Sequence, residues 1–133
     1  MSSLHQLQVY KQNQIATADP GTILLMLYDG AIDALKRATQ HLAAGNMAEK
    51  GTCILQAHDI ITQLVVSLDY DIGGELAHNL EALYRYMLDQ ILRANVKNDP
   101  GLLGKVVALL STLREGWESA VVAQRKRLAQ GAA

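Results

Sequence analysis

The chain has no phenylalanine, two prolines and one cysteine among its 133 residues, and 5% of them are aromatic whereas 50% are hydrophobic. A sheet draws on Phe, Tyr and β-branched residues, so this composition indicates a helical protein rich in leucine and alanine. The single cysteine, Cys53, excludes an internal disulfide and fits a reducing compartment. The length predicts one domain.

The chain also lacks a large excess of charge of either sign and lacks long apolar runs. The formal net charge is −1, and a protein whose main partner is nucleic acid needs a clustered basic surface, so we expect no nucleic-acid partner. No stretch approaches the roughly 18 apolar residues of a membrane-spanning helix. The first residues, MSSLHQLQVYKQNQ, are polar and lack the apolar core of a signal peptide. We therefore expect a cytoplasmic protein without membrane insertion.

Short motifs mark the ends of the expected helices. The motif DPG occurs at 19–21 and at 99–101, where the Asp can cap a helix and the Pro fits its first position. Gly45 and Asn46 predict the end of one helix and the cap of the next. Glu49 is placed three residues after that cap, as in a capping box.

The acidic stretch DYDIGG at 69–74 predicts a further linker, so four helices are expected. In each of them, apolar residues recur at alternating spacings of three and four, which is typical of a core-facing stripe. In the third helix we assign Leu76 to this stripe and Tyr84 to its flank, and in the fourth helix we assign Trp117 to the stripe. Similar lengths and short connections predict an all-α, antiparallel up-down four-helix bundle. The expected helices are 20–44, 47–68, 75–96 and 100–128, within a bundle at 19–128 that follows a mobile N-terminal arm or short extra helix at 1–18 and precedes a disordered tail at 129–133.

Two features exceed what a plain bundle requires. The first stripe continues from Tyr28 to Ala31 past Gly30, although a glycine inside a helix costs about 1 kcal/mol relative to alanine. Close approach of another segment would compensate, either a neighbouring helix, which the periodicity favours, or an additional docked chain. Further apolar residues, such as Leu27 and Val66, flank every stripe. This surplus predicts a thicker core, an oligomer interface or an exposed groove for a partner.

Motifs for catalysis or metal binding are incomplete. A di-iron bundle needs two Glu-x-x-His motifs, and the sequence has one, from Glu75 to His78. DYDIGGE does not continue into a calcium loop, because Leu80 stands where a bidentate Glu is needed. No glycine-rich phosphate loop and no nucleophile with its base can be traced. We therefore predict a protein that is not an enzyme and has no cofactor or metal.

Several segments resemble one known family. MLYDGAI at 26–32, preceded by VYKQNQIATA, is similar to the signature of the flagellar secretion chaperone family FliS. GGELAHNLEALYRYM (73–87) and ILRANVKND (91–99) resemble its third helix, and LREGW (113–117) resembles its fourth. The resemblance implies a cytosolic export chaperone that binds the disordered C-terminal segment of flagellin. Such a chaperone prevents premature polymerisation and aids delivery to a component of the flagellar export gate.

The resemblance, which spans about residues 8 to 120, also implies a site on the arm and the first helix. Tyr10 and Ile15 would cover apolar surface until flagellin displaces them. Tyr28 would combine ring burial with a hydroxyl hydrogen bond, Asp29 would anchor the arm or the ligand, and Gly30 would allow close backbone approach. The alternative function is a structural or signalling bundle that self-associates, for example as a homodimer. The expected partner-binding residues are Tyr10, Ile15, Leu24, Leu27, Tyr28, Asp29 and Gly30.

Overall fold

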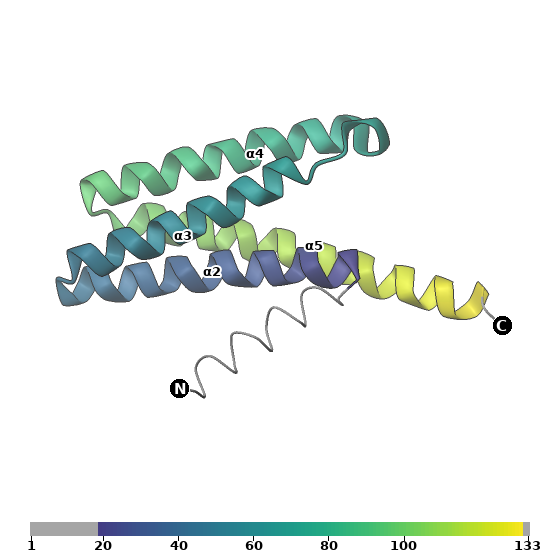
Figure 1. The fold of residues 1–133 in the computed structure, drawn as a ribbon, viewed down its shortest axis with the longest axis horizontal. Coiled ribbons are helices and arrows are strands. Elements are labelled where there is room, and N and C mark those ends of the chain that lie inside the picture. The colour runs from purple at the N-terminus through teal and green to yellow at the C-terminus, as the bar shows by residue number, and fades with distance from the viewer. Residues whose placement is uncertain (1–18, 132–133) are drawn as a thin grey trace, which may run out of the picture.

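Four α-helices make up residues 19–131, the part of the chain that the computed structural model describes (Figure 1). They are α2 (Pro20–Ala44), α3 (Met47–Val66), α4 (Tyr70–Lys97) and α5 (Pro100–Gly131), and this range contains no strand. Consecutive helices pack side by side in opposite directions, and α2 also packs against α5. The four helices thus close a ring, and the expected all-α up-down bundle is confirmed.

Both DPG motifs cap helices as predicted. The Asp19 carboxylate accepts a hydrogen bond of 2.8 Å from the backbone N–H of Thr22 at the start of α2. The Asp99 carboxylate accepts one of 2.9 Å from the backbone N–H of Gly101 at the start of α5. Gly45 ends α2 with a φ of 79°, in the left-handed region that favours glycine.

Several predicted details of the helix ends are wrong, and α3 ends at Val66 rather than at residue 68. The capping box does not form, because the Asn46 side chain makes no cap hydrogen bond and its Nδ2 instead lies 3.3 Å from Nδ1 of His41. Helix α5 continues to Gly131 rather than ending at residue 128. Leucine, alanine and glutamine, which occupy 128–130, are good helix formers, so nothing stops the helix before the glycine. Residues 129–131 of the expected tail are therefore helical.

Helix α4 begins five residues before the expected position at 75, since the stretch predicted as a linker is itself a helical turn. The Asp69 carboxylate caps this turn by accepting hydrogen bonds from the N–H groups of Asp71 and Ile72 at 3.0 and 3.1 Å. Gly74 then interrupts the helix with φ 53° and ψ −124°, a backbone conformation that side chains strongly disfavour. The segment is thus a capped turn followed by a kink.

The core lies between all four helices. In α4 its position differs from the prediction, because Tyr84, assigned to the flank, is 1% exposed and Leu76, assigned to the stripe, is 57% exposed. Tyrosine is tolerated there because its hydroxyl finds a buried partner, as described below. The largest fully buried side chains are Tyr28, Leu35, Ile54, Ile61, Leu64, Tyr84, Met87, Ile91, Leu103, Val106 and Leu110.

One buried charged side chain, the only one among the described residues, ties α3 to the end of α4. Lys50 is 5% exposed, and its Nζ donates hydrogen bonds of 3.0 Å to the Asn95 carbonyl and 2.6 Å to Oδ1 of Asn98. Asn98 ends α4 in the left-handed region, with a φ of 52°. A cation is favourable at a helix C-terminus, because it offsets the partial negative charge of the last carbonyl groups.

Candidate partner-binding site

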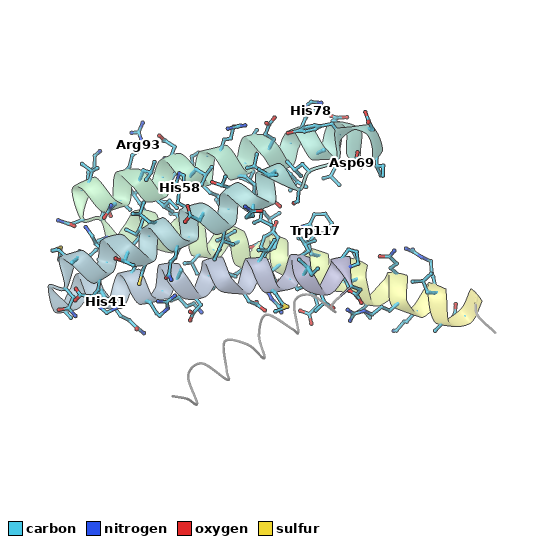
Figure 2. All side chains as sticks on the ribbon, in the orientation of Figure 1. His41, His58, Asp69, His78, Arg93 and Trp117 are labelled. Carbon is cyan, nitrogen blue, oxygen red and sulfur yellow. The ribbon has the colours of Figure 1, made fainter. Side chains whose placement is uncertain are left out.

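An apolar hollow of about 250 Å³ opens at one end of the bundle. There the start of α2, the end of α3, the start of α4 and the middle of α5 meet. Figure 2 shows the side chain of Trp117 projecting from α5 toward the α3–α4 connection, where Asp69 lies. Ile72 and Leu76 are 87% and 57% exposed, so the mouth of the hollow presents apolar surface to solvent. The large apolar residues that line it are Leu24, Leu64, Leu68, Ile72, Leu76, Leu80, Tyr84 and Trp117.

A chain of hydrogen bonds lies beneath the hollow and joins three helices. The indole Nε1–H of Trp117 on α5 donates to the Tyr28 hydroxyl on α2 at 3.0 Å. The Tyr28 hydroxyl is 2.5 Å from that of Tyr84 on α4, and the two rings are tilted at 57° to each other. The two tyrosines are 0% and 1% exposed, so each polar atom is satisfied without water. The ring burial and hydroxyl hydrogen bond expected of Tyr28 are both present.

The same burial affects the acidity of both phenols. Removal from water raises the pKa of Tyr28, although hydrogen bonds with Tyr84 and Trp117 partly oppose this. Burial also raises the pKa of Tyr84, and the hydrogen bond with Tyr28 raises it further. Both hydroxyls therefore remain protonated at neutral pH and can donate as well as accept.

Asp29 lies on the exposed side of α2 and is bonded to α5. Nε and Nη2 of Arg114 approach the two carboxylate oxygens of Asp29 at 2.5 and 3.3 Å, and Nη1 lies 2.7 Å from Glu118. The hydrogen bond to Asp29 raises the pKa of the Arg114 guanidinium. The Asp29 side chain is 55% exposed, so its carboxylate faces solvent while it is paired with α5. Its expected role as an anchor for the arm or the ligand stays a prediction.

Gly30 faces helix α3. A Cβ atom at this position would lie 3.2 Å from Cδ1 of Ile60, closer than ordinary contact, so the glycine lets α2 and α3 approach each other. This geometry supports packing against a neighbouring helix as the reason for the glycine. Gly30 also lines a separate open hollow of about 390 Å³ between α2 and α3, beside Asp33 and Arg37.

The other expected site residues lie in different places. Leu24 lines the apolar hollow, whereas Leu27 is half-buried and packs against the core. Tyr28 is fully buried, so it supports the hollow through Trp117 and does not form its surface. Tyr10 and Ile15 are outside the described residues.

Among the large apolar residues that line the hollow, Leu24 is the only one that the sequence predicts for a site, and three of the others show why. Ile72 lies in the stretch predicted as a linker, and Leu76 and Trp117 were assigned to the core. An isoleucine alone in an acidic, glycine-containing stretch was the available signal for Ile72. No local pattern marks Leu76 and Trp117, since apolar residues of the core and of the edge of a hollow have the same spacing.

The described residues contain no group of three or more His, Cys, Asp and Glu side chains that could hold a metal ion. The three labelled histidines, His41, His58 and His78, lie at different positions along the bundle in Figure 2. Cys53 is buried, and its Sγ accepts a hydrogen bond from Nη1 of Arg37 at 3.4 Å. Within residues 19–131, no helix is both long and apolar enough to cross a membrane.

These features define a class of protein, a four-helix bundle whose apolar hollow is exposed to solvent and can receive a partner. The family model described as "Flagellar protein FliS" matches residues 3–125. The chain belongs to the FliS family, which is a family of chaperones and not of enzymes. The resemblance of the sequence motifs is thereby confirmed.

Named relatives cover most of the chain. The flagellar secretion chaperone FliS of Bacillus subtilis is 35% identical over 117 residues, which are 88% of this chain and 86% of that protein. The flagellar secretion chaperone FliS of Salmonella typhimurium is 39% identical over 112 residues, 84% of this chain and 83% of that protein. A crystal structure of a flagellar chaperone from bacteria has a TM-score of 0.74 and 22% identity over 92% of this chain and 99% of that one, which shows the shared fold.

Proposed function

We propose that this chain is a cytosolic export chaperone that binds the disordered C-terminal segment of flagellin. In this function it prevents premature polymerisation of flagellin and aids its delivery to the flagellar export gate. The observation that carries the proposal is the open apolar hollow with Ile72 and Leu76 at its mouth. Relatives named as flagellar secretion chaperones support the class of cargo.

The hollow suits the apolar side chains of an amphipathic helix. A helix that docks in a groove inserts residues at spacings of three, four and seven, and a hollow of about 250 Å³ takes a few such side chains. Full burial of an exposed leucine or isoleucine contributes about 1.5–3 kcal/mol. Because Ile72 and Leu76 are 87% and 57% exposed, covering both contributes about 2–4 kcal/mol before ordering costs. A disordered segment loses part of this gain because it must fold on binding.

Further exposed apolar side chains extend the surface available to a wrapping segment. Leu55 and Val66 of α3 are 54% and 72% exposed, and Leu92 and Val96 of α4 are 41% and 83% exposed. The two helices are neighbours in the bundle. These four side chains are apolar surface outside the hollow that a wrapping segment would cover in part.

The N-terminal arm is proposed as a removable cover. Tyr10 and Ile15, which lie outside the described residues, would shield apolar surface until flagellin displaces them. Deletion of residues 1–16 should then lower the Kd to its present value multiplied by the fraction of time for which the site is uncovered. Unchanged affinity, together with unchanged solubility, would count against a covering role.

The proposal is tested by calorimetric titration with a peptide of about the last 50 residues of flagellin, a length suited to a wrapping segment. We expect one-to-one binding, a negative heat-capacity change and a gain of helix by circular dichroism. The only tryptophan, Trp117, lines the hollow, so its fluorescence should change on binding. No heat and no added helix with folded protein would refute the proposal.

A pair of matched variants locates the binding surface. Leu76→Ser should weaken binding on the order of tenfold, because it removes most of one apolar contact. Leu128→Ser is the control, since Leu128 is 66% exposed and lies on α5 outside the hollow. Equal effects of the two variants would exclude the hollow as the site. Delivery is tested by measuring the affinity of an export-gate component for the free chain and for the peptide-bound chain.

A further inference from the structure

The first turn of α4, residues 70–73, is called the mouth turn because its residue Ile72 lies at the mouth of the apolar hollow. Ile72 is 87% exposed, so its own side chain holds the turn in place only weakly. The chain continues into the rest of α4 through Gly74, which is not helical. The position of Ile72 relative to the hollow therefore depends on other contacts of the mouth turn.

Tyr70 makes a contact that joins the mouth turn to the helix beyond the break. Its ring centroid lies 4.7 Å from that of the His78 imidazole, and the two planes are tilted at 44°. In an unbroken helix, residues eight apart are separated by roughly 12 Å along the axis, so the two rings could not meet. The contact therefore exists only while the mouth turn is folded back at Gly74.

Two further observations support this folded-back position. A Cβ atom on Gly73 would lie 2.9 Å from Cβ of Ala77, closer than two such atoms can pack, so the turn lies directly against the helix. The Tyr70 hydroxyl is the main cause of a lowered pKa at the Glu81 carboxyl, and Arg85, which pairs with Glu81 at 3.2 Å, lowers it further. The Tyr70 hydroxyl therefore lies beside a carboxylate that follows eleven residues later in the chain.

We propose that Tyr70 is a positioning residue of the partner-binding site, because its ring on His78 holds Ile72 at the mouth of the hollow. Tyr70 and His78 do not line the hollow themselves. In Figure 2, His78 lies on the side of α4 that faces away from Trp117. The effect on binding rests on the proposed function, whereas the position of the mouth turn can be measured without a partner.

The expected effect on binding follows from the strength of the ring contact. Aromatic pairs shift an equilibrium by a factor of roughly 2 to 10. A site that is correctly formed for only part of the time has an apparent Kd that is raised by the inverse of that fraction. Tyr70→Ala should therefore weaken binding by roughly 2- to 10-fold. The loss cannot exceed that of Ile72→Ala, because Tyr70 acts through Ile72.

Nuclear magnetic resonance of the full chain without a partner tests the position of the mouth turn. Loss of the ring in Tyr70→Ala should change the chemical shifts of the His78 imidazole protons and lower the backbone order parameters of residues 71–73 from about 0.85 to about 0.6 or less. Tyr70→Phe keeps the ring and should keep the order. Tyr86→Ala is the control, since Tyr86 is 47% exposed on the same helix. Order parameters that stay high in Tyr70→Ala, or fall equally in Tyr70→Phe, would overturn the proposal.

Calorimetric titration with the flagellin peptide tests whether Tyr70 acts through Ile72. Ile72→Ala should weaken binding on the order of tenfold, because it removes most of one apolar contact. In the double variant Tyr70→Ala/Ile72→Ala, the change at Tyr70 should add almost nothing, since the residue that it positions is missing. Losses that add in full would overturn the proposal, because Tyr70 would then act by another route.

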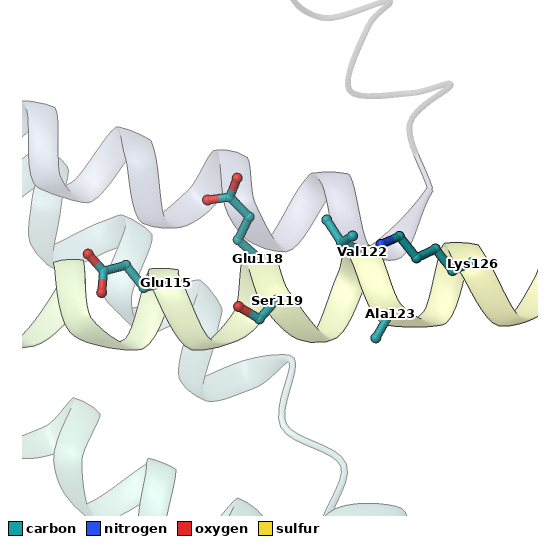
Figure 3. Close-up of a pocket in the computed structure, with 6 residues that line it drawn as sticks. All are labelled: Glu115, Glu118, Ser119, Val122, Ala123 and Lys126. Atoms are coloured by element: carbon teal, nitrogen blue, oxygen red, sulfur yellow. The ribbon is translucent and has the colours of Figure 1, made fainter.

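Val122→Ala is the control for Ile72→Ala. Val122 is 43% exposed and lines a separate open hollow of about 520 Å³ on α5, which shares no residue with the apolar hollow (Figure 3). This variant should leave the Kd unchanged. If the wild-type chain does not bind the peptide, the proposed function fails, and the order parameters still decide whether Tyr70 positions Ile72. Circular dichroism verifies that each variant is folded.

Discussion

Replacing Tyr28 with phenylalanine removes one oxygen atom beneath the hollow and with it two hydrogen bonds. The indole N–H of Trp117 loses its acceptor at 3.0 Å, and the Tyr84 hydroxyl loses its partner at 2.5 Å. Trp117 is half-buried and can turn to water. Tyr84 is 1% exposed, so its hydroxyl remains unpaired within the core.

These two losses differ in size. A hydrogen bond contributes about 0.5–1.5 kcal/mol to stability, whereas a buried polar group left without a partner costs about 1–3 kcal/mol. If Trp117 loses one hydrogen bond and Tyr84 is left unpaired, the two ranges add, and Tyr28→Phe should lower the free energy of unfolding by about 1.5–4.5 kcal/mol. This is a large share of the 5–15 kcal/mol that is typical of a domain. It should lower the Tm by roughly 10 °C.

Urea unfolding followed by circular dichroism measures this loss. The midpoint should fall with little change in the slope, because the surface exposed on unfolding is unchanged. Tyr86→Phe is the control, since Tyr86 lies on the same helix as Tyr84 but is 47% exposed, and it should change stability by less than about 0.5 kcal/mol. A loss below about 0.5 kcal/mol for Tyr28→Phe, or equal losses for both variants, would refute the reasoning. The double variant Tyr28→Phe/Tyr84→Phe should cost less than the sum of the single ones.

The same pair of phenols gives stability a dependence on alkaline pH. In the unfolded chain both ionise near pH 10, whereas burial raises the pKa of Tyr28 and Tyr84 in the folded chain. Above about pH 10 the folded state therefore holds more protons than the unfolded state, and the free energy of unfolding falls as pH rises. The slope is up to about 1.4 kcal/mol per pH unit for each group. Urea midpoints measured from about pH 9 to 11 should fall less steeply in Tyr28→Phe, and equal slopes would contradict the prediction.

Two further variants test the α2 interfaces by urea unfolding. Gly30→Ala should change stability by less than about 1 kcal/mol, since better helix propensity offsets the tight approach to Ile60. Gly104→Ala is the control, because a Cβ at this position meets nothing within 4 Å, and it should raise the free energy of unfolding by up to about 1 kcal/mol. A larger increase for Gly30→Ala than for Gly104→Ala would contradict the tight packing at Gly30. Asp29→Asn should cost on the order of 0.5 kcal/mol, because its pair with Arg114 is exposed. That cost should vanish in about 1 M salt, and persistence there would show that the pair acts through packing.

Local chemistry makes several helix ends predictable from sequence. The DPG motifs and Gly45 act on backbone groups within a few residues, so their effect does not depend on the rest of the fold. The bundle follows from the four apolar stripes, since helices of similar length have few other ways to bury them. DYDIGG is misassigned because its glycines suggest a linker, whereas Asp69 begins a helical turn there.

The candidate site is less predictable, because its residues meet across the chain. The Tyr28 and Tyr84 hydroxyls are 56 positions apart in sequence, and no periodicity indicates that the two will pair. Trp117 has the spacing of a core residue and yet lines the hollow. Family resemblance marks Asp29 and Gly30, but their contacts with Arg114 and Ile60 depend on tertiary packing.

The break at Gly74 divides the wall of the hollow into a part that belongs to the core and a part that is exposed. On one side, Leu80 and Tyr84 belong to the core. On the other, the turn that carries Ile72 is attached to the rest of α4 through a single non-helical residue. Local opening requires the least free energy where few buried contacts must be broken, so amide hydrogens of this turn should exchange before those of the core helices. Protection from exchange should therefore rise within one helix, from Ile72 at the mouth of the hollow to Leu80 and Tyr84 behind it.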